Sequence, residues 1–150
     1  MKPTSLPDVI PNWINGQECA AVSGETFDKL SPDTGRKLFN VGGSGSQDVQ
    51  NAIQAARLAQ ADWAERTPVQ RGEILHDIAQ AMRKHQKEIA EIVAMETGMS
   101  FASALGETGG AIAQGEFAAG EGRRFYGRTT TSAVPNKYAM TVRQPLGVAG

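Results

Sequence analysis

Cys19 is the one cysteine among the 150 residues and therefore the one thiol that could act as a nucleophile. A nucleophilic cysteine needs a helix amino terminus or a neighbouring cation to stabilise its thiolate. Cys19 instead stands between Glu18 and Ala20 in a strand-like segment, where negative charge disfavours the thiolate. We therefore interpret Cys19 as a structural residue, and a small enzyme that uses it has almost no support.

The two histidines do not have the spacing of a metal-binding pair. His76 and His85 lie nine residues apart in a helical pattern, whereas two ligands on one helix face need a spacing of about four. We expect His76 beside a buried stripe and His85 near a helix end. The other candidates are charged residues that are usually solvated: Glu107, Glu116, Glu121, Lys29, Lys37, Lys84, Lys87 and Lys137.

The glycine run from Gly42 to Gly45 precedes a helical pattern and could in principle hold a phosphate. A dinucleotide fingerprint needs a third glycine where Asp48 stands, and a phosphate loop needs a lysine followed by Ser or Thr. The run is therefore interpreted as a strand-to-helix connection. With no nucleophile, base and oxyanion donor in one set, the sequence predicts no catalytic, cofactor-binding or metal-ligating residue in this chain.

The elements that would position any such residues begin with short strands and turns. Asn15-Gly16 predicts a tight hairpin turn, and Ser23-Gly24 and 32–35 predict further turns. Strands are expected at 26–27 and 37–41.

Helices are expected next. Ser46 is the expected cap of the first helix, whose apolar stripe comprises Val49, Ala52, Ile53, Ala56, Ala59 and Trp63. Thr67, Pro68 and Gln70 form a capping box for the second helix, whose expected buried face is Ile74, Leu75, Ile78 and Met82. A third helix, near 86–97, should end at Gly98. The glycine-rich stretch 101–126 is predicted to be a helix held by tertiary packing, since each glycine costs about 1 kcal/mol relative to alanine.

The carboxyl-terminal part should return to extended structure. A loop is expected over 127–135, a strand over 137–142, and the opening of another strand over 146–150. Because the sequence stops inside that apolar pattern, we expect it to be a truncated portion of a longer chain.

Composition narrows the class of protein. Lys and Arg number 15 against 16 Asp and Glu, for a net charge of −1, which gives no electrostatic reason to expect nucleic-acid binding. No apolar run approaches the roughly 20 residues that span a bilayer, and 1–11 lacks a signal-peptide pattern. A single cysteine excludes an internal disulfide, so a cytoplasmic location is expected.

Several segments, taken in order, resemble the aldehyde dehydrogenase superfamily. The segments that carry this likeness are 13–16 (Trp-Ile-Asn-Gly), 31–35 (Ser-Pro-Asp-Thr-Gly), 55–63, 71–75, 96–98 (Glu-Thr-Gly), 126–127 and 144–148 (Gln-Pro-Leu-Gly-Val). Ser31 departs from the family's usual asparagine. Each segment is weak alone, but their order and spacing extend across nearly the whole chain.

The resemblance implies an α/β fold: the amino-terminal part of a Rossmann-type cofactor domain, made of short strands, a helical cluster and an oligomerisation-arm strand at 136–143. It implies oxidation of an aldehyde by NAD or NADP through a cysteine thiohemiacetal. The catalytic domain and all residues of that chemistry would lie beyond Gly150, and Cys19 matches none of them. A homo-oligomer is expected from the arm, whose unpaired edge would seek a partner strand.

Two further candidate sites follow from the resemblance. Gly106, Gly110 and Gln114 would face the substrate tunnel, although plain helix packing explains the same residues. Some relatives bind a monovalent cation near positions matching the Leu30 carbonyl and Glu96, although an ordinary turn and helix end would also account for these. The alternative function is a non-catalytic helical binding or assembly module on the same scaffold.

Overall fold

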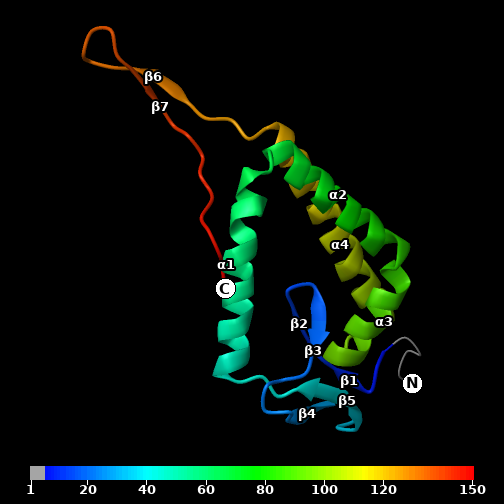
Figure 1. The fold of residues 1–150 in the computed structure, drawn as a ribbon. Helices are drawn as coiled ribbons and strands as arrows, with labels where there is room; N and C mark the ends of the chain where they lie inside the picture. Colours follow the sequence, from blue (N-terminus) through cyan, green and yellow to red (C-terminus); the bar gives the residue numbers. More distant parts are fainter. Residues whose placement is uncertain (1–5) are drawn as a thin grey trace.

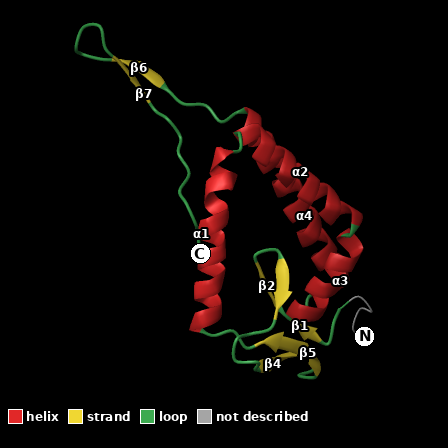
Figure 2. Ribbon diagram, viewed as in Figure 1, coloured by secondary structure: helices red, strands yellow, loops and turns green. Residues whose placement is uncertain are grey.

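The computed structural model describes residues 6–150 as a mixed α/β fold of short strands, four α-helices and a projecting hairpin (Figures 1 and 2). The amino-terminal strands are β1 (Val9–Ile10), β2 (Asn12–Ile14), β3 (Gln17–Cys19), β4 (Thr26–Leu30) and β5 (Lys37–Gly42). The helices are α1 (Ser46–Glu65), α2 (Pro68–Lys84), α3 (Gln86–Thr97), α4 (Phe101–Gly120) and the 3-10 turn η1 (Glu121–Arg123). The last strands are β6 (Thr129–Thr131) and β7 (Tyr138–Met140).

The first strands form two small sheets. β5 lies between β1, to which it is parallel, and β4, to which it is antiparallel. β2 and β3 form a separate hairpin whose turn residues Asn15 and Gly16 have φ of 54° and 73°. Positive φ at both positions is what a type I′ turn requires, so the predicted hairpin is confirmed.

The helix ends follow the predicted local chemistry, with one correction. Thr67 accepts a hydrogen bond from the Gln70 amide, and the Gln70 side chain accepts one from the Thr67 amide. Gly98 closes α3 with φ of 77°, as a left-handed cap should. Ser46 is not the cap of α1: Gly45 holds that position, and Ser46 is already helical.

The core lies where α2, α3 and α4 pack together. Ile112 and Ala104 of α4, Ala79 of α2 and Ala90 of α3 are almost completely buried. Small side chains allow these helices to approach closely, which supports α4 despite its glycines. α4 ends at Gly120, earlier than the predicted limit, and continues as η1.

The apolar stripe of α1 lacks part of its cover, and one prediction about burial, in α2, was wrong. α1 stands apart from the α2–α4 cluster, with the β2–β3 hairpin between them (Figure 1), and its apolar stripe is only partly covered. Val49 remains 55% exposed and Trp63 43% exposed. In α2, Ile78 is likewise half-exposed, although Ile74 and Leu75 are partly covered as expected.

The carboxyl-terminal hairpin projects from the body of the molecule, and the chain then returns toward α1 (Figure 1). β7 confirms the predicted strand, but its partner β6 lies inside the predicted loop. The predicted strand at 146–150 is absent, and these residues are irregular. Within the described part of the chain, none of the helices is both long and apolar enough to cross a bilayer.

Candidate functional site

Gly106, Gly110 and Gln114 lie on one exposed face of α4. Their spacing of four residues places them one above another along the helix. A Cβ added at Gly106 or Gly110 would meet no atom within 4 Å, so the space beside both glycines is open. Phe117 continues the stripe and is 63% exposed. The opposite face, which includes Ile112, is the one that packs against α2 and α3. Helix packing within this chain therefore does not explain these glycines.

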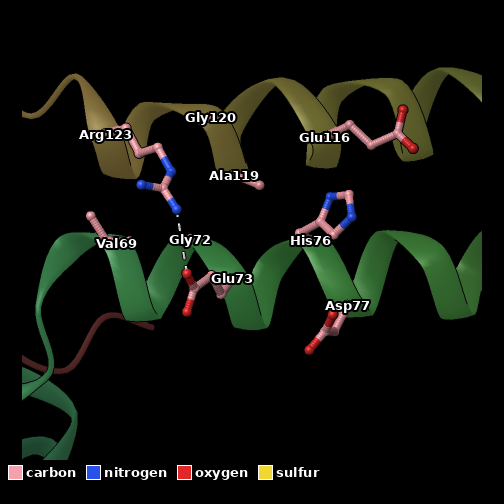
Figure 3. Close-up of a pocket in the computed structure, with 9 residues that line it drawn as sticks. All are labelled: Val69, Gly72, Glu73, His76, Asp77, Glu116, Ala119, Gly120 and Arg123. Atoms are coloured by element: carbon pink, nitrogen blue, oxygen red, sulfur yellow. Dashed lines mark hydrogen bonds and ion pairs between the residues drawn. The ribbon is translucent and has the colours of Figure 1, made fainter.

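A groove between α2 and α4 holds several ionisable side chains (Figure 3). The exposed His76 ring stands between the two helices, and Glu73 is paired with Arg123 at 3.5 Å. Nη2 of Arg83 donates to both carboxylate oxygens of Glu116 at 2.8 Å, which holds the pKa of that carboxyl below its ordinary value. Glu116 is thus not the solvated residue that was expected, because it forms an ion pair across the groove.

The glycine run is confirmed as a strand-to-helix connection, and its amide groups are already used. The Gly43 amide donates to the carbonyl of Glu25 at 2.7 Å, and the Gly45 amide donates to Oδ2 of Asp48 at 2.8 Å. Oδ1 of Asp48 also accepts from the Val22 amide at 2.9 Å. The buried Asp48 carboxylate therefore occupies the amino terminus of α1, where a phosphate would have to bind.

The remaining candidates lie on several different elements of the fold. Cys19 is a free, partly buried cysteine in β3, opposite Asn12 of β2. His85 lies at the junction of α2 and α3, near a helix end as predicted, and pairs with Glu88 at 3.1 Å. Glu121 pairs with Arg124 at 2.7 Å rather than standing alone. Of the lysines, Lys84, Lys87 and Lys137 are exposed, as expected.

The segments that match the monovalent-cation site of some relatives do meet. Pro32, after β4, lies against the end of α3: a Cβ added at Gly98 would be 3.1 Å from Cγ of Pro32. Glu96, however, already faces a cation of this chain, because Nζ of Lys29 lies 4.0 Å from its Oε2. This residue set does not fit a second positive charge. Strand alternation puts Lys29 and Asp28 on opposite faces of β4, but no sequence signal links Lys29 to Glu96, which lies 67 positions along the chain.

Together, these contacts describe a scaffold in which one face of α4 is open. Among residues 6–150, no group of three or more His, Cys, Asp and Glu side chains is placed to hold a metal ion. The ionisable residues singled out in the sequence lie on several elements, and about half of them are engaged in ion pairs. The structure thus defines a mixed α/β fold of short strands and helices.

Comparison with known proteins identifies the family. The sequence model of the aldehyde dehydrogenase family matches residues 19–150. The chain is 35% identical over 135 residues to the succinate-semialdehyde dehydrogenase (NADP+) GabD of Escherichia coli, covering 90% of this chain and 28% of that protein. It is 36% identical over 142 residues to a malonate-semialdehyde dehydrogenase of Lacticaseibacillus casei, covering 94% and 29%.

Solved structures agree with the sequence match. The crystal structure of succinate-semialdehyde dehydrogenase from Burkholderia pseudomallei superposes with a TM-score of 0.88 at 33% identity, covering 92% of this chain and 29% of that one. The chain therefore belongs to the aldehyde dehydrogenase family. It spans 28–29% of the length of these relatives.

Proposed function

We propose that this chain is the amino-terminal portion of an NAD(P)-dependent aldehyde dehydrogenase that oxidises an aldehyde to a carboxylic acid. The observation that carries the proposal is the family match over residues 19–150, supported by the semialdehyde dehydrogenases that share about a third of its residues. The thiolate chemistry and the cofactor contacts belong to residues beyond Gly150. No catalytic step is assigned to residues 6–150, because they contain no matching nucleophile or base.

Within that enzyme, residues 1–150 would form the amino-terminal segment of the cofactor domain. The open α4 face with Gly106, Gly110 and Gln114 would form a wall of the substrate tunnel, and 136–143 would be the oligomerisation-arm strand. The exposed, unpaired edges of the β6–β7 hairpin support a homo-oligomer, since such an edge can pair with a partner strand. The single cysteine supports a cytoplasmic location, and the balanced charge supports small-molecule rather than nucleic-acid partners.

The tunnel role can be tested in the complete polypeptide that carries this chain. Gly110→Trp should raise the KM for the aldehyde and leave the KM for NAD(P)+ unchanged, because the indole would fill open space beside α4. Ala111→Trp is the matched control, since it adds the same side chain at a neighbouring exposed position off that stripe. Succinate and malonate semialdehyde are the first substrates to try, as the names of the relatives direct. Equal KM values for both variants would contradict the tunnel role.

The cofactor assignment is tested on the 150-residue chain. Isothermal titration with NAD+ or NADP+ should give no saturable heat, because the residues that hold the cofactor are proposed to follow Gly150. A saturable heat would show that the cofactor site lies within this chain. If the 150-residue chain alone proved to be a monodisperse monomer with a cooperative melting transition, that result would instead favour the non-catalytic module.

A further inference from the structure

The β4–β5 hairpin docks against the end of α3 through an ion pair. Lys29 points from β4 toward α3, where its Nζ lies 4.0 Å from Oε2 of Glu96. Asp28, on the opposite face of the strand, pairs with Lys37 at 2.8 Å. The two side chains of the Lys29–Glu96 pair are only 33% and 39% exposed, so this pair is partly shielded from solvent.

We infer that the Lys29 ammonium group is the resident cation at this junction, so that the protein needs no bound Na+ or K+ between Leu30 and Glu96. A carboxylate that binds a metal cation must offer its charge to that ion. Here Glu96 already faces a covalently attached positive charge, and a second cation beside it would be repelled by the ammonium group. The inference depends on the geometry of these residues and not on the proposed dehydrogenase activity.

An attached cation has a consequence that a dissociable ion does not share. It remains near Glu96 whichever monovalent salt is present. The stability of this junction should respond to total ionic strength, through ordinary screening, and should not distinguish Na+ or K+ from a large organic cation.

The experiment compares local hydrogen exchange over 26–40 and 94–98 in NaCl, KCl and choline chloride at equal ionic strength. It uses the complete polypeptide that carries this chain, and ²³Na NMR relaxation reports ion binding directly. Lys29→Met removes the ammonium group and keeps the aliphatic stem. Lys37→Met is the matched control, because it removes the same charge from the same hairpin. Lys29→Met/Glu96→Gln also removes the carboxylate.

For the wild-type protein, the hydrogen-exchange rate should be the same in all three salts. The same should hold for Lys37→Met. Lys29→Met should exchange about 2–5-fold faster in choline, the range expected for the loss of a partly exposed ion pair. Na+ or K+ should restore slow exchange in Lys29→Met in a saturable way, but should not do so in the double variant. Saturable protection or Na+ binding in the wild-type protein, or a Lys29→Met variant indifferent to the cation, would overturn the inference.

Discussion

Gly72 and Gly122 allow the backbones of α2 and of the segment after α4 to touch. A Cβ added at Gly72 would lie 2.6 Å from the carbonyl oxygen of Ala119, and one at Gly122 would collide with the carbonyl oxygen of Pro68. A backbone oxygen cannot rotate away as a side chain can. Gly72→Ala should therefore push α2 and α4 apart and destabilise the helical cluster.

The expected change in the free energy of unfolding of Gly72→Ala follows from two opposing effects. Replacing glycine by alanine inside a helix stabilises it by about 1 kcal/mol. An added methyl group in a tightly packed contact costs about 1–3 kcal/mol. Because 2.6 Å is far inside van der Waals contact, we expect the steric cost to exceed the gain in helix propensity. Gly72→Ala should therefore lower the free energy of unfolding by about 1–2 kcal/mol. Gly110→Ala meets open space and should gain up to about 1 kcal/mol.

Urea denaturation followed by far-UV circular dichroism measures both variants against the wild-type protein. The pair is informative because the chemical change is identical and only the surroundings differ. A Gly72→Ala variant as stable as Gly110→Ala would refute the close approach of α2 and α4. A destabilised Gly110→Ala would refute the open face on α4.

Three further predictions concern the α1 cap, the core and the projecting hairpin. The Gly45 and Val22 amides hold the pKa of Asp48 below its ordinary value of 3.8. The stability that Asp48 contributes is therefore complete above pH 3.8 and is lost as the pH falls through the lower pKa of the folded state. Asp48→Asn should have a lower melting temperature than the wild-type protein at neutral pH, and it should lose less stability on acidification. Ile112→Ala empties a fully buried site and should cost about 2–5 kcal/mol in urea denaturation. Tyr138→Lys with Met140→Lys changes only exposed residues, so it should alter stability by less than about 0.5 kcal/mol yet shift sedimentation toward smaller species.

Each of these predictions has a clear contrary result. An Asp48→Asn protein with the wild-type acid sensitivity would show that Asp48 does not accept those amide bonds. A loss below about 1 kcal/mol for Ile112→Ala would mean that the site is not packed as described. An unchanged sedimentation profile for the lysine pair would remove the hairpin from the assembly surface.

Features that depend on a few neighbouring residues could be predicted from the sequence. Asn15-Gly16 determines a tight turn because both residues tolerate positive φ, and Thr67 with Gln70 satisfies amide groups at the start of α2. Gly98 ends α3 for the same local reason. In each case the chemistry that decides the structure lies within four residues, so no knowledge of the distant chain was needed.

Features that depend on distant segments could not be predicted in this way. The periodicity of Val49, Ile53 and Trp63 shows that α1 has an apolar face, but it does not show which segment covers that face. β6 carries three threonines without an alternating apolar pattern, and it becomes a strand only by pairing with β7. The Lys29–Glu96 contact joins residues 67 positions apart, so sequence spacing alone could not indicate it.

The candidate site on α4 could be predicted only in part from the sequence. The spacing of Gly106, Gly110 and Gln114 places them on one helix face by geometry alone. Whether that face is open depends on what the opposite face meets, and the burial of Ala104, Thr108 and Ile112 determines this. The structure thus supplied the exposure that the spacing could not.

The uncovered face of α1 has an energetic consequence for the proposed enzyme. Full burial of one large apolar side chain contributes about 1.5–3 kcal/mol. Val49, Ile53 and Trp63 are still 55%, 40% and 43% exposed, so roughly half of that contribution, about 2–4 kcal/mol in total, is not yet realised. A typical domain has a net stability of only about 5–15 kcal/mol, so this deficit is a large fraction of it. Under the proposed function, the part of the enzyme beyond Gly150 would therefore stabilise α1 while it supplies the chemistry, and the 150-residue chain alone should self-associate through the same face.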